Sequence, residues 1–116
     1  MESPLVHFEL AVSSTEKSRS FYKELFGWEF DWNDEMKYGM LNFKEGPGGG
    51  MMQVEGEMKP MLSVYFQVSN VNEYLAKAES LGATITIPRT EIPNMGAFGM
   101  FMDSDGIVIG IYEEDN

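Results

Sequence analysis

The feature that most constrains the fold is a pattern that occurs twice, once in each half of the chain. Residues 6–12 and 62–68 alternate apolar and polar side chains, as strands do, and each run leads into a polar cap and an amphipathic stretch. Glycines end both stretches, at Gly27 and Gly82, which are 55 residues apart. Three further strand-like segments follow in each half. The chain is therefore predicted to contain two copies of a βαβββ unit.

Each expected helix carries its own start signal and an apolar stripe. Ser13 stands three residues before Glu16, and Asn70 stands three residues before Glu73, which is the spacing of a capping box. The stripes should pack against the strands of the same unit. The side chains expected in the core from these helices and one strand are Phe21, Leu25, Phe66, Leu75 and Leu81.

One helix can cover only one face of the sheet in its unit, so the other face stays open until a second unit curls against it. We therefore predict an α+β fold and a single domain. Its two modules, about residues 1–57 and 58–116, should form a curved mixed sheet around a cleft, with the helices outside. Residues 28–32 are expected to form a strand, and the glycine-rich residues 44–50 a flexible turn before a strand that begins at Met51.

Composition excludes several classes of function. A chain of 116 residues suits one domain, and the lack of cysteine rules out disulfides, thiolate metal sites and cysteine nucleophiles. The formal charge of −11 opposes nucleic acid and anionic membranes as partners, and it would attract a cationic small molecule. No apolar run approaches the roughly 20 residues of a membrane span, and the first residues do not resemble a signal peptide. We therefore expect a cytoplasmic protein with no nucleic-acid or membrane partner.

His7 is the only histidine, and its strand offers it an open face. Phe8 and Leu10 share the face expected to lie under the first helix, which leaves His7 and Glu9 on the other. An imidazole with an ordinary pKa near 6.5 suits a general base, and Glu9 could orient it. A lone histidine on a strand is more often a hydrogen-bonded structural residue than a catalyst. His7 and Glu9 are therefore candidate catalytic residues, and both interpretations stay open.

Several segments together resemble the vicinal oxygen chelate superfamily, the group of glyoxalase I, bleomycin-resistance proteins and extradiol dioxygenases. The resemblance covers nearly the whole chain, and it is closest to small glyoxalase-like proteins with PGGG before the fourth strand. It implies the fold predicted above. The segments that carry it are VHFELAV, FYKELFGWEF, PGGGMM, IPNMGAFGMFMDSDG and IVIGIY.

The resemblance also implies where a metal would bind. In metal-dependent members the ligands come from the first and last strands of each unit, and His7 matches the first ligand position. Ser63 and Gly110 stand where several members have histidine and glutamate, and the fourth strand, Met51 to Gln53, has no carboxylate. A divalent ion needs roughly three protein ligands. We therefore expect an incomplete metal site and no cofactor, with a divalent metal held through His7 as the alternative.

A pocket lined by methionine, tyrosine and a few polar groups is typical of small-molecule sites. The residues expected to bind a ligand are His7, Glu9, Met52, Gln53, Ser63, Tyr65, Gln67 and Tyr112. The favoured function is a glyoxalase-like small-molecule-binding protein of unassigned reaction. The alternatives are a metal-dependent lyase, isomerase or dioxygenase-type enzyme using His7, and a bleomycin-resistance-like protein that sequesters a cationic drug. The resemblance further implies a homodimer.

Overall fold

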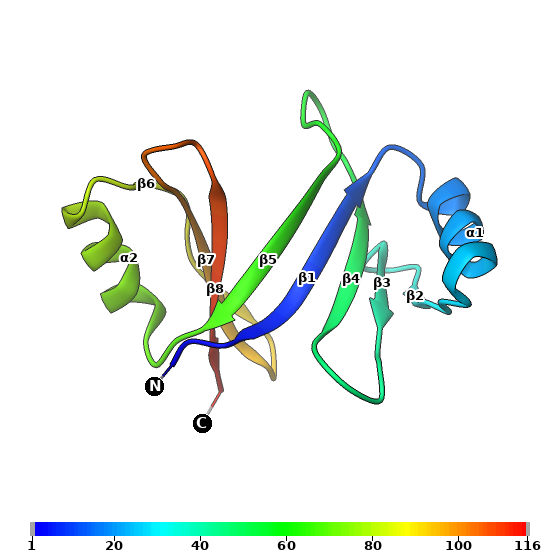
Figure 1. The fold of residues 1–116 in the computed structure, drawn as a ribbon, viewed down its shortest axis with the longest axis horizontal. Coiled ribbons are helices and arrows are strands. Elements are labelled where there is room, and N and C mark those ends of the chain that lie inside the picture. The colour runs from blue at the N-terminus through cyan, green and yellow to red at the C-terminus, as the bar shows by residue number, and fades with distance from the viewer. Residues whose placement is uncertain (1, 116) are drawn as a thin grey trace. The chain divides into compact units, whose positions relative to one another are not determined.

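The predicted pair of βαβββ modules is confirmed. The computed structural model describes residues 2–115 and has an α+β fold (Figure 1). Residues 7–63 form one compact unit, and residues 64–115 together with 2–6 form the other. The elements in chain order are β1 (Leu5–Val12), α1 (Thr15–Phe26), β2 (Asp31–Asn33), β3 (Tyr38–Leu41), β4 (Gly48–Gln53), β5 (Met61–Gln67), α2 (Val71–Ser80), β6 (Thr84–Ile92), β7 (Gly96–Met102) and β8 (Val108–Glu114).

In the first module the strands follow the order β2-β3-β4-β1. The pairs β2–β3 and β3–β4 are antiparallel, and β4 pairs in parallel with β1. Two boundaries differ from the sequence prediction. The strand expected over residues 28–32 begins only at Asp31, and β4 begins at Gly48, so three glycines expected in a turn lie in the sheet.

Helix α1 starts one residue later than predicted, because Ser14 is the N-cap and its hydroxyl accepts from the backbone N–H of Lys17. Gly27 ends the helix with a φ of 76°, as expected from the repeat. The helix packs through aromatic side chains. The ring of Tyr22 stacks on Trp28, with centroids 5.3 Å apart, and Trp28 contacts Phe8 of β1 at 6.0 Å. Phe8 therefore faces α1, as predicted.

The core prediction for α1 is wrong. Phe21 and Leu25 are each 58% exposed, and no residue of the helix is fully buried. The rings of α1 reach the sheet through Trp28, which contacts Tyr22 of the helix and Phe8 of β1, and Phe21 and Leu25 stay outside this contact.

In the second module the strands follow the order β5-β8-β7-β6. The pair β5–β8 is parallel, and β8, β7 and β6 are antiparallel neighbours. Asn70 caps α2 as predicted, with its side chain accepting from the N–H of Glu73. Val71 and Leu75 of α2 are buried against Val68 and Ile111 of the strand layer. Figure 1 shows α2 beside this sheet, so the core of the module lies between the two.

The other three core predictions have different outcomes. Leu75 is 3% exposed, which confirms it as a core residue, and Phe66 is half-buried. Leu81 is 78% exposed, and the prediction for it is wrong. It is the C-cap of α2, with φ −94° and ψ 6°, so it has left the helical stripe that would have directed it inward.

None of the helices described in residues 2–115 is long and apolar enough to span a membrane.

Candidate functional site

A chain of hydrogen bonds joins His7, Tyr38 and Glu9 on the open face of the first module. Nε2 of His7 lies 3.0 Å from the hydroxyl of Tyr38, and this hydroxyl donates to Oε2 of Glu9 at 2.9 Å. His7 and Glu9 come from β1 two residues apart, and Tyr38 begins β3. All three side chains are part-buried. The two predicted candidates are therefore connected through a third residue.

With Glu9 ionised, the chemistry of the three groups assigns a direction to each bond. A carboxylate can only accept hydrogen bonds, so the single O–H of Tyr38 points to Glu9. The hydroxyl oxygen must then accept from His7, which places a proton on Nε2 of the imidazole. In the neutral ring the lone pair lies on Nδ1. Nδ1 is therefore the basic nitrogen of the neutral imidazole.

Burial lowers the pKa of His7 from its usual value of 6.5. The sequence left two opposing effects open, because the Glu9 charge would raise this pKa and desolvation would lower it. Desolvation dominates, and the Tyr38 hydroxyl stands between the imidazole and the carboxylate. His7 is therefore neutral at pH 7, which is the state a general base requires.

The glycines of β4 make room for Tyr38. A Cβ atom built on Gly50 would lie 1.7 Å from the Tyr38 hydroxyl oxygen and 2.1 Å from Cζ. On the other face of the strand, a Cβ on Gly49 would lie 2.4 Å from the ring of Phe8. Successive strand residues face opposite sides, so the two glycines admit one aromatic ring on each side of β4. The run at residues 48–50 therefore serves ring packing across a strand.

Sequence reasoning missed Tyr38 as a site residue. The available signal was the glycine at position 50, because glycine within a strand often marks a close approach by another group. Using that signal required the pairing of β3 with β4, in which Tyr38 lies opposite Met52. The turn assigned to residues 44–50 hid that pairing. Met52, a predicted ligand residue, is half-buried on the face that carries Tyr38.

The second module also places a tyrosine ring over a glycine of its last strand. Glu9 pairs with Gly50 across β1 and β4, and Tyr65 pairs with Gly110 across β5 and β8. The Tyr65 ring covers Gly110, where a Cβ would lie 2.4 Å from its Cδ2. Its hydroxyl donates to Sδ of Met100 at 3.8 Å. Tyrosine rings thus cover the glycine of the last strand in both modules.

Other predicted ligand residues have different surroundings. Gln53 lies exposed at the end of β4, and its amide donates to the carbonyl of Ser13 and accepts from the N–H of Thr15 at 3.3 Å. The Tyr112 hydroxyl donates to the carbonyl of Met95 at 2.6 Å, and burial is the main cause that raises the pKa of this phenol. Gln53 and Tyr112 therefore form hydrogen bonds with backbone groups of their own modules.

Ser63 and Gln67, the remaining candidates, both belong to β5. Ser63 is 7% exposed, and Gln67 is half-buried at the end of the strand.

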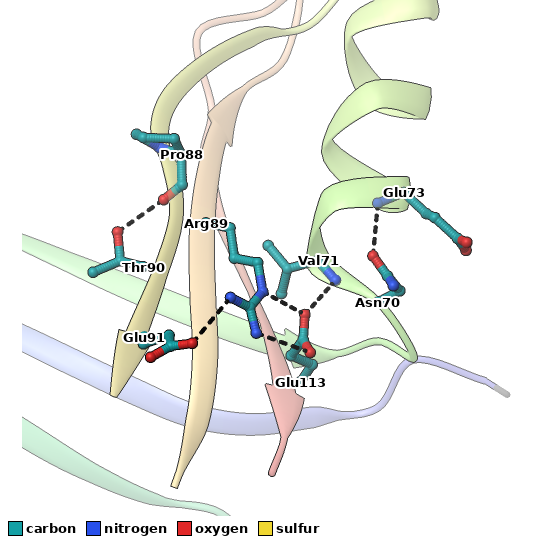
Figure 2. A network of polar contacts seen from close by, with 8 residues as sticks. All are labelled: Asn70, Val71, Glu73, Pro88, Arg89, Thr90, Glu91 and Glu113. Carbon is teal, nitrogen blue, oxygen red and sulfur yellow. Dashed lines mark hydrogen bonds and ion pairs between the residues drawn. The ribbon is translucent and has the colours of Figure 1, made fainter. Parts of the chain in front are cut away.

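A cluster of charged side chains at one edge of the second module anchors α2 (Figure 2). The carboxylate of Glu113 accepts from the N–H of Val71 at 2.8 Å and from Nε of Arg89 at 3.2 Å. The guanidinium of Arg89 also lies 3.7 Å from Glu91. The hydrogen bond from Arg89, followed by that from Val71, lowers the pKa of Glu113. This cluster joins β6, β8 and α2 and was not anticipated from the sequence.

The donors do not fit the family's divalent metal site. Within residues 2–115 no group of three or more His, Asp or Glu side chains is placed to hold a metal ion. His7 and Glu9 both bind the hydroxyl of Tyr38, while Gly110 and its first-module counterpart Gly50 supply no side-chain donor. Three or more imidazole or carboxylate ligands are the usual requirement.

Comparison with known proteins agrees with the architecture. The family model described as "Glyoxalase/Bleomycin resistance protein/Dioxygenase superfamily" matches residues 5–111. Curated relatives from Mycobacterium bovis and Mycobacterium tuberculosis, each named "Putative glyoxylase CFP32", are 23% identical over 124 residues. The match covers 90% of this chain, and the chain spans 43% of the length of those relatives.

Solved structures of low sequence identity share the fold. The Mn(II)-bound glyoxalase from Novosphingobium aromaticivorans superposes with a TM-score of 0.72 at 12% identity, covering 96% of this chain and 38% of that one. Methylmalonyl-CoA epimerase from Mycobacterium tuberculosis superposes with a TM-score of 0.69 at 14% identity, covering 97% and 88%.

Proposed function

Because this chain belongs to the glyoxalase/bleomycin resistance protein/dioxygenase superfamily, we propose that it is a glyoxalase-like small-molecule-binding protein that works without the family's divalent metal. Its chemical centre is the hydrogen-bonded chain His7–Tyr38–Glu9 on the open face of the first module. The reaction, if the bound molecule undergoes one, uses proton transfer at His7.

The observation that carries this proposal is the position of Tyr38. Its phenol lies over Gly50, the counterpart of the Gly110 position at which the family resemblance expects a carboxylate ligand. In this chain the hydroxyl binds the candidate ligand His7 and the neighbouring Glu9 instead. The polar groups of this face are thus arranged as donor and acceptor for one another and for an organic ligand.

The chain has a defined division of roles. Tyr38 orients the His7 ring through Nε2, and Glu9 orients Tyr38. A ligand that offers a hydrogen-bond donor or an acidic C–H to Nδ1 of His7 meets a neutral imidazole, because burial lowers the pKa of this group. The relatives named as glyoxylase, glyoxalase and epimerase make such a small organic ligand reasonable for this chain.

A thermal-shift screen against a panel of neutral and cationic small molecules tests the proposal. Compounds that raise the Tm of the wild type should lose most of that shift in His7→Ala and in Tyr38→Phe. Tyr22→Phe, which removes a hydroxyl from α1 and keeps the ring that stacks on Trp28, is the matched control and should keep the shift. Hits that survive both first-module substitutions would contradict the site.

The metal-dependent alternative requires a separate measurement. After incubation with Ni, Zn, Mn or Fe and dialysis, elemental analysis should find far less than one metal ion per chain. One tightly held ion per chain that is lost in His7→Ala would instead support a metal-dependent lyase, isomerase or dioxygenase-type enzyme, and would overturn the proposal.

A further inference from the structure

A cavity opens between α2 and the sheet of the second module, and none of its lining residues belongs to the His7 site. Its volume is about 320 Å³, which falls within the range of small-molecule pockets. All of its lining belongs to one compact unit of the chain. The lining residues are mostly aliphatic and aromatic. They are Ser3, Phe66, Val68, Tyr74, Lys77, Ala78, Leu81, Phe101, Ile109 and Ile111.

The cavity lies beside the second half of α2, beyond the helix residues that are fully buried. Val71 and Leu75, in the first two turns, are buried to 0% and 3% exposure. The next side chain on this stripe is Ala78, which is too short to reach the strands. Leu81 could close the gap, but it lies in the C-cap and is 78% exposed. The strand side chains below Ala78 are consequently only partly covered.

The surface of the cavity is almost entirely apolar. The polar groups of its lining residues, the hydroxyls of Ser3 and Tyr74 and the ammonium of the exposed Lys77, therefore stand at its rim, and each can donate a hydrogen bond. None of the lining residues is acidic, although the chain carries 19 acidic residues against 8 basic ones. Within residues 2–115, Lys77 belongs to none of the ion pairs formed at 4.0 Å or less. An apolar cavity with a single cation therefore stands out from an otherwise acidic chain.

From this combination we infer that the cavity binds an unbranched aliphatic carboxylate. The hydrocarbon tail lies under Ala78 against Phe66, Phe101 and Ile109, and the carboxylate pairs with Lys77. The driving force is burial of methylene groups, and the ion pair sets the polarity of the head group. This inference is independent of the proposed function, which uses the other module.

Calorimetric titration with decanoate, below its micelle concentration, tests the inference. Decyltrimethylammonium has the same tail and the opposite charge, so it should bind at least tenfold more weakly. Shortening the tail to octanoate should weaken binding by about fourfold for each methylene removed from the cavity.

Three substitutions locate the ligand. Ala78→Leu fills the cavity and should weaken decanoate binding more than tenfold. Lys77→Met keeps the aliphatic stem and removes the charge, and it should weaken binding about three- to fivefold, as befits a partly exposed ion pair. Lys23→Met is the matched control, since Lys23 is the basic residue in the last turn of α1, and it should change nothing.

Three outcomes would overturn the inference. Equal affinity for the two head groups, or decanoate binding unaffected by Ala78→Leu, would remove the assigned site. A dimer that decanoate does not dissociate and that Ala78→Leu breaks would show that a second copy of the chain fills the cavity instead. His7→Ala should leave decanoate binding unchanged, so the failure of one proposal is distinguishable from the failure of the other.

Discussion

Tyr38 and Gly50 depend on each other at the site. The phenol can lie across β4 only because Gly50 has no Cβ, and the phenol in turn connects His7 to Glu9. A substitution at Gly50 should therefore act mainly through the tyrosine. It changes the site without changing any of the three polar side chains.

We expect Gly50→Ala to lower the free energy of unfolding by about 1–3 kcal/mol, because the added methyl group overlaps the Tyr38 ring. In a Tyr38→Ala background the same change should cost less than about 0.5 kcal/mol. Urea denaturation of the four proteins of this double-mutant cycle measures the coupling. Equal costs in both backgrounds would mean that the ring does not lie on Gly50.

His7 should make stability depend on pH in a defined window. Its folded-state pKa is lowered, so the unfolded chain takes up the proton first as the pH falls. Well above pH 6.5 both states are neutral and the histidine contributes nothing. Below 6.5 stability falls, by at most about 1.4 kcal/mol per pH unit, until the pH passes the folded-state pKa.

The measurement is urea denaturation at pH 7.5 and 5.5 for the wild type and His7→Gln. The wild type should lose more stability than the variant between these two pH values. Carboxylates contribute equally to both proteins, so they cancel in the comparison. An identical loss in both proteins would show that His7 has an unshifted pKa.

His7→Ala should lower the free energy of unfolding by no more than about 1 kcal/mol at pH 7. The side chain is part-buried, and Tyr38 retains its bond to Glu9 after the substitution. Urea denaturation provides the check, alongside the ligand screen. An unfolded variant would assign His7 to the structure of the module, and the site assignment would then be wrong.

At the scale of single residues, the sequence predicted His7 and Glu9 as site residues but did not predict their hydrogen-bond partner, Tyr38. His7 and Glu9 share a face by simple alternation, which needs no knowledge of the fold. Tyr38 joins them from another strand, and its register depends on which strands pair. The pKa of His7 depends on burial, which alternation does not give. The core assignments of Phe21 and Leu25 failed for a related reason, since periodicity identifies an apolar stripe but not how much of it is covered. The assignment of Leu81 failed because the helix ends before it.

At the scale of the elements, a side chain from the last strand of each module accepts a hydrogen bond from the first backbone N–H of that module's helix. Gln53 lies three residues after Gly50, and its side chain accepts from the N–H of Thr15 at the start of α1. Glu113 lies three residues after Gly110, and it accepts from the N–H of Val71 at the start of α2. Unpaired N–H groups at a helix N-terminus favour such acceptors, and a carboxylate also suits the helix dipole.

Glu113→Ala should lower the free energy of unfolding by about 0.5–2 kcal/mol at pH 7, because it removes a cap and the partner of Arg89. Glu114→Ala, at the exposed neighbouring position, should stay within about 0.5 kcal/mol. The lowered pKa of Glu113 means that its contribution is present above its ordinary value of 4.5 and lost as the pH falls through the lowered one.

Thermal denaturation of the two variants at pH 7 and at pH 3 measures the effect. The difference in Tm between Glu113→Ala and Glu114→Ala should be smaller at pH 3 than at pH 7. A gap of the same size at both pH values would contradict the ionic part of this anchor.

The repeat predicted the elements of both modules well and their boundaries less well. Helix caps and glycine stops are local signals, and Asn70, Gly27 and both helices agree with them. The short strand β2 starts at Asp31 because the preceding aromatic residues pack as loop side chains around Trp28. Alternating apolar residues occur both in strands and in loops whose side chains pack inward, so the pattern alone does not show where the strand begins.

For the whole molecule, the two modules keep one framework and differ in polarity at equivalent places. The first module has Glu9 beside Gly50, and the second has the buried Tyr65 beside Gly110. The fold class followed from the repeat alone, because two βαβββ units leave few alternative architectures. The chemistry of the site did not follow from the repeat, because the residue types at these few positions determine it independently of the fold.

The chain should be a homodimer at about 10–100 μM, as the family resemblance implies. Several apolar side chains of the first module are left outside its core, including Met36 at 70% exposure and Phe26 at 58%. Light scattering on a size-exclusion column gives the mass directly. A mass of one chain, 13.1 kDa, across this range would contradict the expectation.

The central claim is the hydrogen-bonded chain through His7, and nitrogen NMR of the single histidine tests it most directly. Long-range proton–nitrogen correlations distinguish the two imidazole tautomers, and His7 has no other histidine signal to overlap with. The proposed chain predicts a neutral ring at pH 7 with its proton on Nε2, a pKa below 6.5, and altered nitrogen shifts in Tyr38→Phe. A proton on Nδ1, a pKa at or above 6.5, or nitrogen shifts that Tyr38→Phe leaves unchanged would contradict it.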